Sequence, residues 1–351
     1  MSATPYGAVL IYGAGAVGQF IGGTLALAGR DVTFLARPTL RDALARAPLT
    51  ITADQPGLGT PRPNAIAIPT IGAIGELSRP PGLVILAVKG YDTVGALPDL
   101  RQLVAAGATV LTVQNGVGHE ETLCDALGAA AVRSGALTIN VSVAAPGQIV
   151  RHTQQGGLGL APVGRGEIAP LPELFRPTLL PLVTARTHRV LKWSKMLLNI
   201  LGNAQAALLD CTSGELYADP RLFAVERRAF HEARAVMRAA GIGLIDLPAY
   251  PVRALTVAMA LPAPVAQRVL VGRLSRGRGS KAPSLALDLH AAHGKSEIAW
   301  YNGAIVALGA RHGVPTPVNA TLTRLVAAAA ADPAARERYR GQPERLLAEL
   351  H

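Results

Sequence analysis

Three polar side chains recur at four-residue spacing within an apolar stretch of the chain: Lys195, Asn199 and Asn203. The residues between them are mainly Leu, Ile and Met, which is typical of a buried helix. On a helix the three would form one stripe about 12 Å long, because each residue rises about 1.5 Å. A lysine in such surroundings is costly unless an anion meets it. The stripe therefore indicates either an anion site or a helix edge where the lysine reaches solvent and the asparagines cap backbone groups.

The lysine also fits one particular chemistry, the reduction of a ketone. Adding hydride to a carbonyl carbon leaves negative charge on the oxygen, and a donor placed there stabilises and then protonates the alkoxide. A partly desolvated lysine can have its pKa lowered toward the working pH. We therefore expect Lys195 to be a general acid, provided that another part of the chain holds a hydride donor.

A pattern typical of dinucleotide binding lies near the start of the chain. The apolar run 8–12 predicts a strand buried on both faces, and residues 20–28 and 31–36 predict a helix and a second strand. Between the first strand and the helix lie Gly13, Ala14, Gly15, Ala16, Val17 and Gly18. In this context the three glycines allow a tight turn, approach of a pyrophosphate and close helix packing, whereas in isolation they would indicate only a turn. The helix N-terminus would supply N–H groups to the anion.

Polar residues follow three predicted strands at their C-terminal ends, where open α/β sheets bind ligands. Arg37 stands where an NAD-selective site has Asp or Glu, and a guanidinium can hold a 2′-phosphate bidentately, so NADPH is favoured. Lys89 follows the strand-like run 83–88 and is a candidate anion contact. Asn115 follows the run 110–113 and is a candidate contact for nicotinamide or substrate. The alternatives are solvated loop residues for the two cations and a common Asn-Gly turn for Asn115.

The pattern of predicted elements changes near residue 188. Before it lie the buried strands and a loop-rich segment at 41–81. Strand-like segments at 137–143 and 157–160 suggest an antiparallel sheet edge, and 184–187 is the last predicted strand. After it, helices are predicted at about 190–207, 221–241, 254–271, 284–293, 296–313 and 317–330. The predicted fold is α/β, with an N-terminal Rossmann-type dinucleotide-binding domain at 1–187 and a C-terminal all-helical domain at 188–351.

A second polar group lies in the helical half. It contains Ser284 and Asp288, followed by Ser296 and Glu297. An N-cap and a first-turn acid would explain the last two without any ligand. The basic, glycine-rich segment 273–281 suggests a solvated connection rather than a phosphate clamp.

Composition narrows the class of protein. At 351 residues the chain can form two domains with real cores. The net charge of +11 is scattered and lacks a nucleic-acid-binding motif, so no nucleic-acid partner is expected. Neither a membrane span nor a leader segment is predicted, which favours the cytoplasm. Cys124 and Cys211 suggest buried small hydrophobes rather than a disulfide or a metal site.

These motifs, taken in order over nearly the whole chain, resemble the ketopantoate reductases (2-dehydropantoate 2-reductases). The resemblance rests on the glycine turn, Ala36-Arg37, Val88-Lys89, Gln114-Asn115-Gly116, Lys192-Trp193-Ser194-Lys195 with Asn199 and Asn203, 209–216, Ser284, Asp288, 296–298, Asn302-Gly303 and 313–319.

The resemblance implies NADPH-dependent reduction of 2-dehydropantoate to pantoate, in pantothenate and coenzyme A biosynthesis. It implies that Lys195 is the general acid, and that Arg37 takes the 2′-phosphate while Lys89 lines the site. Residues matching substrate-binding positions are Asn115, Asn199, Asn203, Ser213 and Ser284. Residues matching cofactor-binding positions are Gly13 to Gly18, Arg37, Lys89, Asn115 and Glu297. No metal is implied, and the apolar C-terminal half is compatible with a homodimer.

Two departures from the family pattern lie on the expected substrate side. Ser213 replaces an asparagine, and the spacing from Asp288 to Glu297 is one residue longer than expected, after a long segment at 273–278. They leave open a different 2-oxo acid as substrate. A redox-sensing or nucleic-acid-binding protein that uses the dinucleotide as a signal is a further alternative, and it predicts indifference to loss of Lys195.

Overall fold

The computed structural model describes residues 6–53, 64–153, 155–164, 166–278, 283–291 and 293–350. It contains two compact units. The first comprises residues 1–114, 119–191 and 247–250, and the second comprises 115–118, 192–246 and 251–351.

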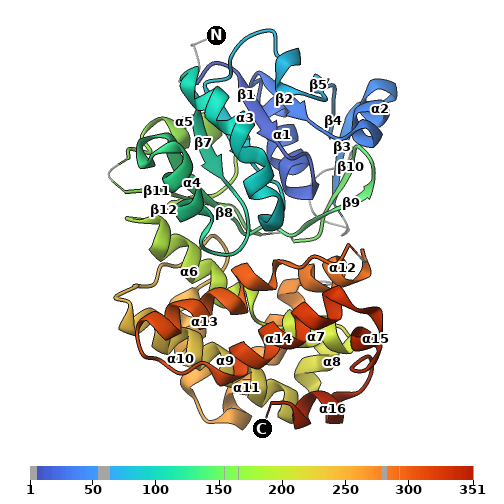
Figure 1. Ribbon diagram of the computed structural model, residues 1–351, viewed down its shortest axis with the longest axis vertical. Helices are drawn as coiled ribbons and strands as arrows, with labels where there is room; N and C mark the ends of the chain where they lie inside the picture. The colour runs from blue at the N-terminus through green and yellow to red at the C-terminus, as the bar shows by residue number, and fades with distance from the viewer. Residues whose placement is uncertain are drawn as a thin grey trace. The chain divides into compact units, whose positions relative to one another are not determined.

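The first unit is built on an eight-stranded sheet with the order β12-β11-β8-β7-β6-β1-β2-β5 (Figure 1). All neighbouring pairs are parallel except β11 with β8. The strands are β1 (Val9–Tyr12), β2 (Val32–Leu35), β5 (Thr70–Ile71), β6 (Leu83–Leu86), β7 (Thr109–Thr112), β8 (Val132–Leu137), β11 (Leu158–Pro162) and β12 (Leu182–Thr184). The helices of this unit are α1 (Ala16–Leu27), α2 (Pro38–Arg46), α3 (Thr93–Ala105), α4 (His119–Leu127) and α5 (Pro170–Phe175), with 3-10 turns η1 (Ile74–Glu76), η2 (Gly90–Asp92), η3 (Ala129–Ala131) and η4 (Arg176–Thr178).

Helices cover both faces of this sheet, because its strands are apolar on both sides. Val9 and Ile11 of β1 pack with α1 and α5 in one core. Leu10, between them, faces the opposite way and packs with α3 and α4 in a second core. Alternate side chains of one strand thus pack into the cores on the two faces of the sheet, as expected for a buried parallel strand.

A separate four-stranded sheet has the order β4-β3-β10-β9. Its strands are β3 (Leu49–Ala53), β4 (Asn64–Ile66), β9 (Val141–Ala145) and β10 (Gln148–Arg151). The prediction of one strand over 137–143 was therefore wrong: β8 ends at Leu137 in the main sheet and β9 begins at Val141 in the other. The strand predicted at 184–187 is also displaced, since β12 ends at Thr184.

The second unit is helical. Its elements are α6 (His188–Asn199, which begins in the first unit), α7 (Ala204–Leu209), α8 (Ser213–Ala218), α9 (Pro220–Ala239), α10 (Val252–Ala260), α11 (Ala263–Arg278), α12 (Ser284–His290), η5 (Glu297–Trp300), α13 (Asn302–Arg311), α14 (Pro317–Ala331), α15 (Pro333–Glu337) and α16 (Pro343–Ala348). None of the helices in the described ranges is long and apolar enough to cross a membrane.

Three predicted helices are interrupted. The one predicted at 296–313 consists of the 3-10 turn η5, which ends at Trp300, and of α13, which begins at Asn302. The helix predicted at 254–271 breaks between α10 and α11, because Pro262 forces Leu261 into an extended conformation with ψ 160°. The helix predicted at 190–207 ends at Asn199 and resumes at Ala204. The connection predicted at 273–281 is helical as far as Arg278, and residues 279–282 lie outside the described ranges.

Candidate functional site

The glycine turn between β1 and α1 has the geometry of a phosphate-binding loop. Gly13 has φ +99°, and a Cβ there would lie 2.7 Å from the Val88 nitrogen. A Cβ on Gly18 would collide with the Gly13 carbonyl, so both positions require glycine. At Gly15 an added Cβ would meet nothing within 4 Å. The space beside the N-terminus of α1 is thus open to a ligand, and an anion there would meet unpaired N–H groups.

The two candidate cations of the first unit follow β2 and β6, the two strands that flank β1. Arg37 precedes α2, its side chain is 89% exposed, and its guanidinium lies 3.8 Å from the Asp92 carboxylate. Such a surface pair is weak and leaves the guanidinium accessible to a phosphate. Lys89 is half-buried and directly precedes η2, which contains Asp92. The ends of β2 and β6 therefore carry positive charge, which fits a nucleotide phosphate.

Gln114 fixes the neighbouring strand ends, a role that the sequence did not predict. It is buried, and its Nε2 donates to the Val88 carbonyl at 3.0 Å and to Thr93 Oγ1 at 2.8 Å. Its Oε1 accepts from Thr112 Oγ1 at 3.0 Å. These bonds tie the end of β7 to the segment after β6.

Asn115 belongs to the second unit. In the loop that it begins, Gly116 has φ +92° and a Cβ there would lie 2.7 Å from the Trp300 carbonyl oxygen. Val117 N–H donates to that same oxygen at 3.1 Å. The loop is therefore held against the end of η5, the turn that begins with Glu297.

Glu297 is buried, and its backbone N–H donates to Asp288 Oδ2 at 3.1 Å. Ser296 Oγ accepts from the Ile298 N–H at 3.2 Å, so its interpretation as an N-cap is confirmed. The Asp288 carboxylate thereby joins α12 to the start of η5.

Lys195, Asn199 and Asn203 do not lie on one continuous helix. Lys195 and Asn199 lie on α6 one turn apart, and Lys195 is half-buried beside fully buried Met196. The chain then leaves the helix at Gly202, which has φ +55°, and Asn203 precedes α7. The single stripe was therefore a wrong prediction. A Gly-Asn pair is an ordinary end-and-start signal for helices, and it was present in the sequence.

The helix break nevertheless groups the candidate substrate-binding residues. Asn203 Nδ2 donates to the Asn199 carbonyl at 3.0 Å and to Ser284 Oγ at 3.3 Å, and its Oδ1 accepts from the Leu285 N–H at 3.2 Å. Ser213 Oγ donates a hydrogen bond to the Gly202 carbonyl at 3.4 Å. Asn199, Asn203, Ser213 and Ser284 thus lie together.

Glu226 stabilises this break from the buried face of α9. Its side chain is 3% exposed, and it accepts from the Gly202 N–H and from Gln205 Nε2, each at 2.6 Å. The sequence carried a signal for it: a glutamate four residues from Leu222 and from Phe230 lies on the apolar face of its helix.

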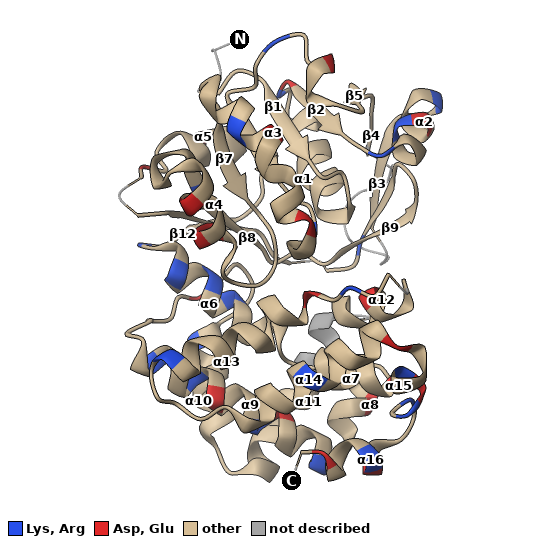
Figure 2. Cartoon of the chain, in the orientation of Figure 1, with Lys and Arg blue, Asp and Glu red and all other residues tan. Residues whose placement is uncertain are grey.

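The charge on α6 suits an anionic substrate. The helix contains Arg189, Lys192 and Lys195 and no Asp or Glu, and Figure 2 shows it as a basic segment. Ser194 Oγ accepts from the Ile245 N–H at 3.0 Å and fixes one face of the helix. Within the described ranges no group of three or more His, Cys, Asp or Glu side chains could hold a metal ion.

Two sequence profiles cover most of the chain. The profile described as "Ketopantoate reductase PanE/ApbA" matches residues 9–164, and "Ketopantoate reductase PanE/ApbA C terminal" matches residues 187–330. The chain belongs to the ketopantoate reductase family. The resemblance seen in the motifs is thereby confirmed, and so is the fold class: an α/β N-terminal part with a parallel-stranded sheet and a helical C-terminal part.

Named relatives support an oxidoreductase. The chain is 28% identical to a 2-dehydropantoate 2-reductase of Halobacterium salinarum over 92% of this chain and 99% of that one. It is 27% identical to the enzyme of that name from Aquifex aeolicus, over 91% and 96%.

Solved structures agree. A PanE/ApbA family ketopantoate reductase from Ralstonia eutropha JMP134 superposes with a TM-score of 0.73 at 29% identity, covering 95% of this chain and 99% of that one. D-mandelate dehydrogenase, solved with NADH and anilino(oxo)acetate, has a TM-score of 0.76 at 22% identity over 92% and 98%, which shows a shared fold. The family implies a nicotinamide dinucleotide as cofactor, and the open glycine turn with its neighbouring cations fits one.

Proposed function

We propose that this ketopantoate reductase family member reduces 2-dehydropantoate to pantoate with NADPH, a step of pantothenate biosynthesis. The observation that carries the proposal is the grouping of Asn199, Asn203 and Ser284 around the break that follows Lys195 on α6. Hydroxyl and amide groups suit the hydroxyl and carboxylate of such a substrate, and the basic helix suits its charge.

Lys195 is the proposed general acid. When bound, the dinucleotide supplies a hydride to the carbonyl carbon, and the oxygen then needs a proton. Lys195 is half-buried on α6, one helical turn before Asn199. Its ammonium stabilises the developing alkoxide and then donates the proton that completes the alcohol.

Cofactor binding is proposed for two groups of residues. Gly13, Ala14, Gly15, Ala16, Val17 and Gly18 would hold the pyrophosphate, with Arg37 on the 2′-phosphate and Lys89 nearby. Asn115, in the loop 115–118, and Glu297, the first residue of η5, would contact the nicotinamide end. The domain limits 1–187 and 188–351, a cytoplasmic location and a homodimer stay predictions.

The test is turnover of 2-dehydropantoate with NADPH by Lys195→Ala and Lys195→Arg. Loss of a general acid costs about 10²- to 10⁴-fold in rate. Arginine keeps the charge but holds its proton, so it should rescue little if proton donation is the role. NADPH affinity, measured by fluorescence titration, should be retained in both variants. Unchanged turnover in Lys195→Ala would rule out Lys195 as the general acid.

A different 2-oxo acid is the second candidate, because Ser213 replaces the family's asparagine and lies against Gly202. A panel of 2-oxo acids, with NADPH consumption as the readout, separates the two. A higher kcat/KM for another acid than for 2-dehydropantoate would favour it.

A further inference from the structure

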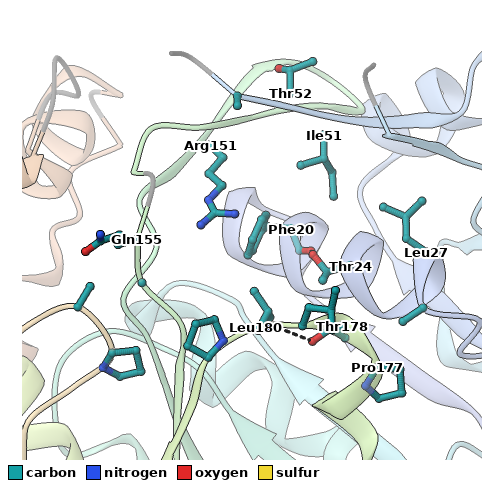
Figure 3. A pocket seen from close by; sticks show the side chains of 17 residues that line it. Phe20, Thr24, Leu27, Ile51, Thr52, Arg151, Gln155, Pro177, Thr178 and Leu180 are labelled. Atoms are coloured by element: carbon teal, nitrogen blue, oxygen red, sulfur yellow. Dashed lines mark hydrogen bonds between the residues drawn. The ribbon is translucent and has the colours of Figure 1, made fainter. Parts of the chain in front are cut away.

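The first unit contains a cavity that none of the proposed chemistry uses. Its volume is about 670 Å³, within the range of small-molecule sites. It lies among the second half of α1, strands β3 and β10, and the turn after η4 (Figure 3).

This cavity is distinct from the glycine turn. The α1 residues that line it begin at Phe20 and continue through Thr24 to Ala28, whereas the turn precedes the helix. Thr24 lies nine residues after Gly15, which is about 14 Å along a helix axis. A pyrophosphate at the turn therefore leaves the cavity accessible.

The walls are mostly apolar and carry one charge. Phe20, Ile51 and Leu180 supply apolar surface, and Arg151 is the charged side chain among the described lining residues. In Figure 3 the Arg151 side chain reaches from β10 into the cavity toward Phe20. Its Nε donates to the Thr153 carbonyl at 2.8 Å, which fixes the plane of the guanidinium.

Arg151 is half-buried, and this burial lowers the pKa of its guanidinium. An anion in the cavity would offset that cost of desolvation. The threonines of the wall are less suited to recognise a ligand, because Thr24, Thr52 and Thr178 each donate their hydroxyl proton to a backbone carbonyl. Charge recognition thus falls to Arg151.

Backbone strain gathers at the same place. Within the described ranges three residues other than glycine have positive φ, and two of them, Leu179 at +58° and Ala249 at +66°, line this cavity. Such conformations are strained for L residues and concentrate at ligand sites. The Leu179 side chain is also 89% exposed.

We propose that this cavity binds a small amphipathic monocarboxylate, with its carboxylate on the Arg151 guanidinium and its alkyl chain against Phe20, Ile51 and Leu180. A planar carboxylate matches the guanidinium fork, and the apolar walls exclude a fully polar anion.

Octanoate is the probe, with octan-1-ol and acetate as matched compounds that lack the charge or the chain. Binding is followed through the methyl NMR signals of Ile51 and Leu180 at constant ionic strength. Octanoate should bind at least about tenfold more tightly than either compound. Octan-1-ol lacks the charge-assisted contact, and acetate lacks the alkyl chain that the apolar walls bury. Equal affinity for octan-1-ol, or displacement of octanoate by NADPH, would overturn the proposal.

Two variants test the residue assignment. Arg151→Gln should weaken octanoate about tenfold or more, while Arg101→Gln, on the exposed surface of α3, should not change it. Leu27→Glu adds a carboxylate at the partly exposed rim and should abolish binding by repulsion. Octanoate affinity that is unchanged in Arg151→Gln, or binding that is retained in Leu27→Glu, would refute the assignment. Both variants should retain NADPH affinity.

Discussion

Replacing Gly202 by alanine should destabilise the helical unit and weaken substrate binding. Its φ of +55° costs an L residue about 1–2 kcal/mol. A Cβ there would also lie 2.7 Å from Tyr217 Oη and 2.8 Å from Ser213 Oγ, and both residues are buried. Forcing such neighbours apart costs about 1–3 kcal/mol. The free energy of unfolding should therefore fall by about 2–5 kcal/mol.

Gly241→Ala is the matched control. Gly241 has φ +65°, but a Cβ there would meet nothing within 4 Å, so it should lose only the conformational contribution. Urea denaturation followed by tryptophan fluorescence reports on the helical unit, because the chain's two tryptophans, Trp193 and Trp300, both belong to it.

The functional consequence can be separated from the loss of stability. Asn203 follows Gly202 directly and contacts Ser284, so displacement of the break should raise KM for 2-dehydropantoate. NADPH affinity should change less than KM, since the residues proposed to hold its phosphates lie in the other unit. Equal destabilisation by Gly202→Ala and Gly241→Ala would show that Tyr217 and Ser213 do not restrict the space at Gly202.

Three further outcomes are expected. Arg37→Gln should weaken NADPH affinity about tenfold or more while leaving NADH affinity unchanged. Arg46→Gln, at the far end of α2, is the control. Equal loss of affinity for both cofactors would contradict the assignment. Glu226→Gln should lower the free energy of unfolding by about 1–3 kcal/mol, because either the Gly202 N–H or Gln205 Nε2 loses its carboxylate acceptor. It should also raise KM for the 2-oxo acid more than KM for NADPH. Unchanged kinetics and an unchanged urea midpoint would contradict this role of Glu226. Burial raises the pKa of the Cys211 thiol to about 11. Its alkylation at pH 8 should therefore be roughly a hundredfold slower than that of free cysteine, and the rate should keep rising beyond pH 10, whereas a plateau near pH 9 would disagree.

The sequence predicted the elements whose pattern is local. Residues 8–36 carry a buried strand, a glycine turn and a helix in immediate succession, and each is fixed by its own side chains. The prediction failed where long-range pairing decides the structure. Residues 137–143 are uniformly strand-like, yet the chain changes sheets within them because β9 pairs with β10 rather than with the main sheet.

The sequence predicted which residues belong to the candidate site, but not the backbone conformation that positions them. Four-residue spacing correctly grouped Lys195 with Asn199 on one helix, and it failed beyond Asn199. Periodicity carries no information on the left-handed turn at Gly202. Its N–H is bound by Glu226, and the Tyr217 hydroxyl occupies the space that a Cβ would need, both from later helices. Side chains distant in sequence decide that break.

The loop 115–118 has a consequence for synthesis on the ribosome. Val117 N–H donates to the carbonyl of Trp300, which is made 183 residues later. At about 5–20 residues per second, that partner emerges about 10–40 s after the loop itself. The loop must therefore wait, outside its final setting, until nearly the whole chain has been translated. Asn115, the candidate contact for nicotinamide, is therefore positioned late in the synthesis of the chain.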